Sequence, residues 1–354
     1  MVVTRWGKTE LRVKRWYCGK CKIYGHSNPI GLDGSGLSPA VLENLIFLTS
    51  HLSYRESQEA LELQRIELSV GQCEQKHHKY AAKYEEESKS RLIKQATELL
   101  PKGEEEHWVI EIDGMYVMER DKPIKGQSEG REIKQTVLYP LSEYQNKPKN
   151  NNKKDRRRYY LNQAGNLEQF AMLNQGMLRQ WGFRRNDKLI GLADGAPWID
   201  NLFDELGVEV RILDVIHASQ YLDIIMQAMG WNEEKRSAER ASWMRADLNA
   251  RVWLKEYLPD PEIWLCWDEK AQKALKYLED RLEQMDYYDF KKQNYPIASG
   301  VIEGAANSVI AARMRRSGMR WTFSGINRMA NLRAEYASSQ TILDFNQLRL
   351  LAFP

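Results

Sequence analysis

The sequence predicts an α/β protein, with a mixed β-sheet covered by helices and a helical region in front of it. Residues 37–100 carry apolar side chains at helical spacing, whereas residues 101–140 have the pattern of three successive strands. From residue 165 to residue 214 helices and strands alternate, which is typical of helices that cover a sheet. The 354 residues suffice for two domains or for one domain with additions, and a hydrophobic content of 42% excludes a disordered or collagen-like chain.

The charge of the chain is almost balanced, with 52 Lys and Arg against 49 Asp and Glu, so bulk charge does not predict a nucleic-acid partner. The basic residues gather instead in three blocks, at 1–22, 147–158 and 313–333. A single block of this kind is usually a solvated face. Three of them in a near-neutral chain favour a polyanionic partner.

Cysteine usage and hydropathy indicate the compartment. Four scattered cysteines do not suit a disulfide scaffold, which favours a reducing environment. No apolar run approaches the roughly 20 residues of a membrane helix, and the first residues lack the apolar core of a signal peptide. The sequence therefore predicts a cytoplasmic protein with no membrane partner.

Residues 37–100 have clear helix starts. Ser38 and Pro39 predict a cap and a first helical residue, and capping boxes begin at Ser53 and at Ser69. Three helices joined by short turns suit a helix-turn-helix-like DNA-binding region, whose last helix would present Gln72, Gln75, His78 and Lys79 to a groove. A plain helical bundle has the same spacing, so both interpretations stay open.

The remaining elements follow in chain order. Strands are predicted at 107–113, 115–119, 132–140, 188–194 and 208–214, and helices at 165–181 and 199–206. Residues 215–295 are predicted to be mostly helical, with breaks at Pro259 and Pro261, and five tryptophans there are more typical of a buried core than of stacking on bases. The end, from residue 299 to residue 353, is again predicted to be helical.

Two carboxylates occupy the predicted ends of strands, each directly before a glycine. Asp113 precedes Gly114, and Asp194 precedes Gly195. If the strands are neighbours, the carboxylates converge, and each pKa would rise unless a hard cation neutralised the pair. We therefore expect a Mg²⁺ or Mn²⁺ site, although either residue alone could belong to a surface Asp-Gly turn.

A third carboxylate, Glu303, lies on a predicted helix stripped of bulk by small residues, among them Gly300 and Gly304. Glycine costs a helix about 1 kcal/mol, so these positions suggest that a phosphate backbone approaches closely. Asn307 lies one turn further along nearly the same face. A packed helix contact is the alternative explanation.

Four motifs in order resemble a known family. They are EIDGMYV with Asp113, LADGAPWI with Asp194, the ILDVIH motif with Asp214 and His217, and SGVIEGAANSVIAARMRRSGMRW with Glu303. This order resembles the DDE transposases of bacterial insertion sequences, with closest likeness to the Kra-type group, which is related to the Mutator class. The likeness covers about residues 105–340.

The resemblance implies an RNase H-like catalytic domain in which Asp113, Asp194 and Glu303 hold two Mg²⁺ or Mn²⁺ ions for DNA cleavage and strand transfer. It implies supporting roles for Asp214, His217 and Asn307, although His217 could equally be a structural residue after its strand. The implied partner is double-stranded DNA, at transposon ends and target, bound by a homo-oligomer. The expected DNA-binding residues are Gln72, Gln75, Lys79, Lys153, Lys154, Arg156, Arg157, Arg158, Arg313, Arg315, Arg316 and Arg320.

The resemblance also divides the chain. Residues 1–36 would be the remnant of a zinc-ribbon-like segment, since Cys18 and Cys21 provide only half of a tetrahedral zinc site. Residues 37–100 would be the helix-turn-helix-like region, 101–230 the first part of the catalytic domain, 231–295 a helical insertion, and 296–354 the helix with Glu303 and the C-terminal helices.

Two other functions remain open. The chain could be a transposase-derived protein that binds DNA without cutting it, although the retention of all three acids speaks against this. It could also be a hydrolytic nuclease of the same fold that performs no strand transfer.

Overall fold

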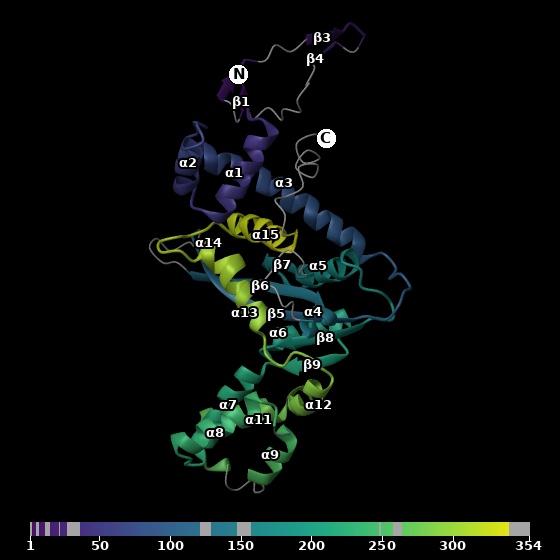
Figure 1. The fold of residues 1–354 in the computed structure, drawn as a ribbon, viewed down its shortest axis with the longest axis vertical. Coiled ribbons are helices and arrows are strands. Elements are labelled where there is room, and N and C mark those ends of the chain that lie inside the picture. The colour runs from purple at the N-terminus through teal and green to yellow at the C-terminus, as the bar shows by residue number, and fades with distance from the viewer. Residues whose placement is uncertain are drawn as a thin grey trace.

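The protein has a mixed α/β fold built around one five-stranded sheet (Figure 1). The computed structural model describes residues 2–4, 7–10, 15–20, 22–26, 36–120, 129–146, 157–247, 249–257 and 264–339. The sheet consists of β5 (His107–Glu119), β6 (Glu129–Pro140), β7 (Tyr159–Ala164), β8 (Lys188–Ala193) and β9 (Val210–Leu213), in the order β7-β6-β5-β8-β9. β6 is antiparallel to β5 and β7, whereas β8 is parallel to both β5 and β9.

The predicted break at Gly114 is wrong, because β5 runs without interruption through Asp113 and Gly114. Its ladder with β6 extends from the pair Trp108–Pro140 to the pair Glu119–Glu129. Because β6 pairs with β5 along this whole length, the backbone hydrogen bonds continue across Gly114, and no turn forms there. Gly114 instead leaves space for the side chain of Glu132 on β6. The strand β7 (Tyr159–Ala164) was not predicted from the apolar pattern of the sequence.

The N-terminal region contains two small hairpins and three helices. The hairpins are β1 (Val2–Thr4) with β2 (Gly7–Thr9), and β3 (Arg15–Cys18) with β4 (Ile23–His26). The helices are α1 (Pro39–His51), α2 (Tyr54–Glu62) and α3 (Val70–Ala96). The predicted capping boxes are both confirmed, at Ser53 for α2 and at Ser69 for α3. The apolar sides of these helices form a core of their own, which Leu332 joins.

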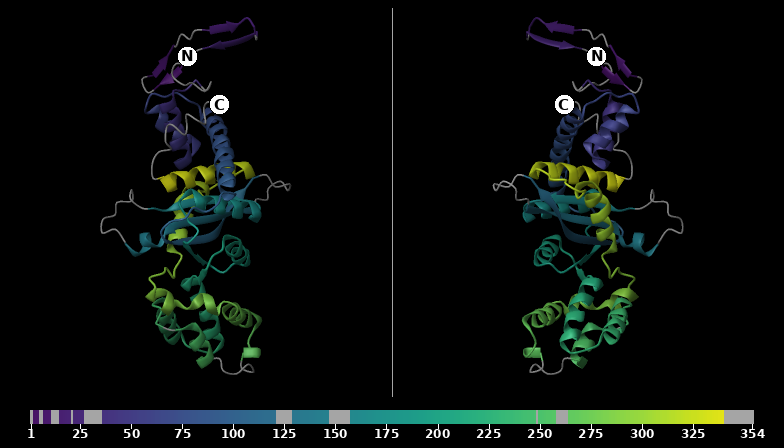
Figure 2. Two further views of the ribbon diagram at one scale, coloured as in Figure 1. Left: turned by 90° about the vertical axis from the view of Figure 1, so that its right-hand side faces the viewer. Right: turned by 90° about the vertical axis from the view of Figure 1, so that its left-hand side faces the viewer.

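Helices cover both faces of the sheet (Figures 1 and 2). On one face α5 (Leu167–Gln180) and α6 (Pro197–Leu206) pack with Trp108, Ile110 and Ile112 of β5. Alternate residues of the same strand, Val109 and Val117, belong to the core of the other face. That face is covered by α13 (Gly300–Ala305), the π-helical turn η3 (Ala306–Ala311) and α15 (Phe323–Ser339), and α14 (Ala312–Met314) follows η3. Helix α7 (Val215–Ala228) follows β9 and packs with the helical segment beyond the sheet, and the short α4 (Leu141–Gln145) follows β6.

The predicted helical segment after residue 231 lies at one end of the molecule, opposite the N-terminal helices (Figure 2). Its elements are α8 (Glu233–Met244), α9 (Ala250–Tyr257), α11 (Glu269–Glu279), the 3₁₀ turn η2 (Leu282–Met285) and α12 (Tyr287–Lys292). Trp243 and Trp253 are buried in its core, and the other three expected there, Trp231, Trp264 and Trp267, are half-buried against it. Within the described ranges no helix combines the length and the apolarity needed to cross a membrane.

Candidate active site

The central parallel strands bring Asp113 and Asp194 to neighbouring positions. The last pair of the β5–β8 ladder is Ile112 with Ala193, so the two aspartates are the next residues on adjacent strands. Ile112 and Ala193 face the core under α5 and α6, and the side chains that follow them therefore point to the opposite face. The two strands are thus neighbours, as the expected convergence of the carboxylates requires, and Asp113 lies inside its strand and not at its end.

Glu303 reaches this same face from α13. Ile302, the residue before it, is buried in the core on that face, whereas Glu303 itself is exposed. Asn307 is also exposed, in the first turn of η3. Glu303 is near enough to Asp113 for its negative charge to act on that carboxyl.

The electrostatics of Asp113 reflect its acidic neighbours. Burial raises the pKa of Asp113, and the negative charges of Asp194 and Glu303 raise it further. The Gly114 N–H, which donates to Asp113 Oδ1 at 2.7 Å, and the nearby His217 act in the opposite direction. A cation near Asp113 would offset this negative charge.

The donor chemistry of this site fits a hard divalent cation, since Mg²⁺ and Mn²⁺ prefer carboxylate oxygens. The side chains do not close around one ion as they stand, because no three His, Cys, Asp or Glu residues in the described part of the chain have the required spacing. Asp194 Oδ1 is also engaged with the protein, since it accepts a hydrogen bond from Ala196 N at 2.9 Å.

Asp214 has a structural position. It is fully buried and caps α7, because its Oδ1 accepts from the N–H groups of Ile216 and His217 at 2.7 and 2.9 Å. Its Oδ2 accepts from Ser299 N at 2.6 Å, just before α13. Both oxygens are used by the backbone, so a direct contact of Asp214 with metal or DNA is not available in this arrangement.

Sequence reasoning missed Glu111, a fully buried carboxyl two residues before Asp113. Burial raises its pKa to about 7, against hydrogen bonds from Tyr139 and Ile302 that lower it. A charged residue between the apolar residues of WVIEI, residues 108–112, was the available signal. Alternation along the strand puts it on the same face as Asp113.

Helix α11 contacts the turn after β8, which sequence reasoning also missed. Tyr277 Oη donates to the carbonyl of Asp194, and Arg281 Nη2 donates to the carbonyl of Gly195 at 2.8 Å. Gly195 has a φ of +79°, and a Cβ there would collide with Tyr277 Oη. The helical segment thus fixes the backbone beside Asp194.

The expected DNA-binding residues of α3 lie at the surface. Gln72, Gln75 and Lys79 are all exposed on this helix. Gln72 is partly occupied, however, because its Oε1 accepts from Ser69 N at 2.8 Å in the capping box.

Several arginines of the basic blocks are used inside the protein. Arg313 is buried, with its guanidinium over the rings of Tyr54 and Trp321, so its expected contact with DNA is withdrawn. Arg316 is exposed but holds Glu56 at 2.5 and 2.6 Å, and Arg158 lies half-buried near Tyr139.

The other expected DNA-binding residues of the basic blocks are either exposed or outside the described residues. Arg157, Arg315 and Arg320 are exposed. Lys153, Lys154 and Arg156 lie outside the described residues, as does Cys21, whereas Cys18 ends β3. The structure therefore contributes nothing to the predicted zinc site.

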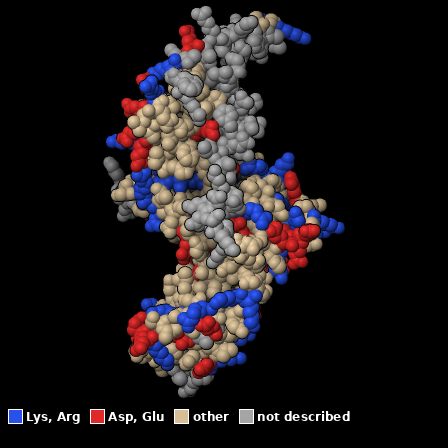
Figure 3. Space-filling model, viewed as in Figure 1, with Lys and Arg blue, Asp and Glu red and all other residues tan. Residues whose placement is uncertain are grey.

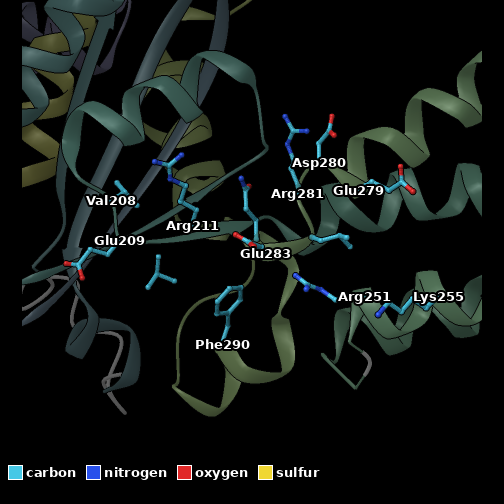
Figure 4. Close-up of a pocket in the computed structure, with 13 residues that line it drawn as sticks. Val208, Glu209, Arg211, Arg251, Lys255, Glu279, Asp280, Arg281, Glu283 and Phe290 are labelled. Carbon is cyan, nitrogen blue, oxygen red and sulfur yellow. The ribbon is translucent and has the colours of Figure 1, made fainter.

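A cavity of about 1000 Å³ lies between β9 and the helical segment (Figure 4). Four basic and four acidic side chains line it: Arg211, Arg251, Lys255, Arg281, Glu209, Glu279, Asp280 and Glu283. The numbers of basic and acidic side chains are equal, and Asp113, Asp194 and Glu303 do not line the cavity. Arg281, which also binds the carbonyl of Gly195, lies between the cavity and the turn beside Asp194.

A search against models of protein families finds none that matches this chain, and a search of curated proteins finds no match.

Proposed function

We propose that the protein is a DDE-type DNA transposase, which binds the ends of a mobile DNA element and catalyses metal-dependent strand cleavage and strand transfer. The observation that carries the proposal is that Asp113 and Asp194 follow paired residues of two adjacent parallel strands, with Glu303 near enough for its charge to raise the pKa of Asp113. Three neighbouring carboxylates suit a site for two Mg²⁺ or Mn²⁺ ions.

The sheet supports an RNase H-like catalytic domain as part of this proposal. Its first three strands form an antiparallel meander, and the fourth and fifth add to the other side of the first in parallel. This order puts the first and the fourth strand side by side, which is what the resemblance of the motifs leads one to expect.

The proposed chemistry is in-line phosphoryl transfer. Divalent metal ions, once bound, supply Lewis acidity for the attacking and the leaving oxygen. Asp113, Asp194 and Glu303 would hold them, while Tyr277 and Arg281 keep the Asp194 turn in place. His217 stands close enough to Asp113 to influence its pKa, which suits a supporting role.

DNA would be held by the helix-turn-helix-like region and by basic side chains. Figure 3 shows Lys and Arg side chains gathered at the level of α14 and α15 and in a band across the helical segment at the other end. Phosphate contacts of this kind position a duplex without reading its sequence. Exposed Arg315 and Arg320 belong to the block that follows the Glu303 helix.

The test is cleavage of labelled duplexes that cover the DNA on both sides of the gene, in Mg²⁺, by wild-type and Glu303→Gln protein. We expect cleavage by the variant to fall by several orders of magnitude, since glutamine removes a metal-binding charge and keeps the shape. DNA binding in Ca²⁺, measured by gel shift, should remain at the wild-type level.

Glu234→Gln, at an exposed position on α8, is the matched control and should cut normally. Normal cutting by Glu303→Gln would contradict the assignment of the site. Binding of the duplex by wild-type protein without any cutting would instead identify a DNA-binding derivative. Cutting without the joining of a freed 3′-hydroxyl end to a second duplex would identify a hydrolytic nuclease.

A further inference from the structure

Glu111 joins three elements at the centre of the acidic site. Its side chain is fully buried on β5, Oε1 accepts from Tyr139 Oη of β6 at 2.5 Å, and Oε2 accepts from Ile302 N of α13 at 2.8 Å. Both oxygens therefore have a donor, one from the sheet and one from the helix that carries Glu303. A buried carboxyl is costly unless its oxygens are satisfied in this way.

The contact with Ile302 supplies something that α13 lacks. The helix begins at Gly300 without a side-chain cap from Ser299, and it continues without a break through η3 and α14 to Met314. The first N–H groups of a helix have no partner inside the helix, so the start of α13 depends on acceptors from other elements. Glu111 accepts from one of these N–H groups, and Asp214 binds the N–H of Ser299 just before them.

We propose that Glu111 is a positioning residue, which fixes where Glu303 stands over Asp113 by holding the N–H of Ile302. Along β5 the ligand Asp113 follows Glu111 on the same face, and along α13 the ligand Glu303 follows Ile302 directly. The hydrogen bond between Glu111 and Ile302 therefore fixes the position of Glu303 on α13 relative to Asp113 on β5. This role rests on the proposed function in one respect, the assignment of Glu303 as a metal ligand. The hydrogen bond between Glu111 and Ile302 does not depend on that assignment.

Tyr139 orients the carboxyl for this task. Its hydroxyl donates to Oε1, which leaves Oε2 directed at the helix. Glutamine has nearly the same shape, and its amide oxygen can still accept from Ile302 N while its amide nitrogen donates to Tyr139 Oη. Leucine fills the space but leaves both donors unpaired.

The experiment compares Glu111→Gln and Glu111→Leu with wild type in the full chain, by three measurements. Hydrogen exchange reports on the N–H groups of 302–305, titration with Mn²⁺ alone reports on the metal site, and cleavage of the flanking duplex at saturating DNA reports on the reaction. For Glu111→Leu we expect at least tenfold faster exchange, and Mn²⁺ affinity and cleavage rate lowered about 10- to 100-fold, as for residues that orient metal ligands. The Kd for DNA should not change.

Glu111→Gln should restore all three readouts to near the wild-type values. Glu119, another buried carboxyl on β5, pairs with Arg131, so Glu119→Gln is the matched control and should behave as wild type. The double variant Glu111→Leu/Tyr139→Phe removes the Tyr139 hydroxyl, so only Ile302 N is left without its acceptor. Fast exchange at 302–305 in this double variant would show that it results from the lost contact between Glu111 and α13.

Unchanged exchange and Mn²⁺ affinity in folded Glu111→Leu would overturn the positioning role, even if wild type cuts DNA. If wild type neither binds Mn²⁺ nor cuts, the proposed function fails, and the exchange of 302–305 alone still decides whether Glu111 holds α13.

Discussion

His77 is a buried imidazole that ties α3 to α1. Thr49 Oγ1 lies 2.8 Å from the carbonyl oxygen of Leu45 and 2.8 Å from His77 Nδ1, so a hydrogen bond joins the threonine and the ring. Burial lowers the pKa of His77 to about 3, and the positive charges of His78, Arg313 and Arg328 lower it further. The imidazole therefore stays neutral in the folded protein at neutral pH.

This depressed pKa predicts acid sensitivity. The stability contributed by neutral His77 is fully present above its ordinary pKa of 6.5 and is lost as the pH falls toward the folded value. At pH 5 the loss amounts to about 2 kcal/mol, from ~1.4 kcal/mol per pH unit. Urea unfolding at pH 7 and pH 5 should show this difference in wild type, and His77→Gln should abolish most of it.

Thr49→Val is the control for that measurement. It removes the hydroxyl and lowers stability at both pH values but leaves the imidazole buried, so the pH dependence should persist. An equal pH dependence in wild type and His77→Gln would show that another group is responsible.

Among the elements, α3 offers the clearest test of sequence-specific binding. Gln72 also serves the capping box, so alanine there would remove the hydrogen bond from Ser69 N as well as any contact with a base. Gln75 is exposed on the same helix and gives the cleaner variant. If this helix reads the DNA end, Gln75→Ala should lower discrimination against random duplex by about 1–3 kcal/mol.

Gel shifts with the end duplex and with random duplex of equal length measure this discrimination. Gln220→Ala, at an exposed position on α7, is the matched control. Equal loss of affinity for both duplexes would mean that Gln75 contacts the backbone only, and no loss for either would remove it from the interface.

The elements also show what the sequence could predict. Local signals identified α1 to α3, since the caps at Ser53 and Ser69 depend on residues three positions apart. Asp113 and Asp194 were predictable because each stands beside a glycine after an apolar run. The partners of Glu111 were not, because Tyr139 and Ile302 lie 28 and 191 residues away along the chain. The continuity of β5 likewise depends on β6 and not on its own residues.

At the scale of the whole molecule, buried arginines connect the N-terminal helices to the acidic site. Arg333 of α15 donates to the carbonyl oxygens of Ser50, at the end of α1, and of Ser308, in the turn after α13, each at 2.5 Å, and also to that of Val309. Arg313 Nε adds a bond to the carbonyl of Thr49 at 3.2 Å. Two cations thus bind the C-terminal end of α1, where a helix attracts positive charge.

From these bonds of Arg333 we predict a coupling between α1, in the region proposed to bind DNA, and the helix that carries Glu303, a proposed ligand of the catalytic metal ions. Burial lowers its pKa to about 10, helped by Arg313, so it stays charged at neutral pH. Arg333→Met should cost about 3–5 kcal/mol, because the carbonyl oxygens lose a charged donor inside the protein. Arg320→Met, at an exposed position, should cost less than about 0.5 kcal/mol.

Chemical unfolding measures the two costs, and hydrogen exchange locates them. If Arg333 holds the two regions together, exchange should rise in the variant both at the end of α1 and in 306–311, although about 260 residues separate them in the sequence. A rise confined to α15 would mean that the guanidinium stabilises only its own helix. In that case the link between the N-terminal helices and the Glu303 helix would depend on Arg313 and Arg316, which bind Thr49 and Glu56.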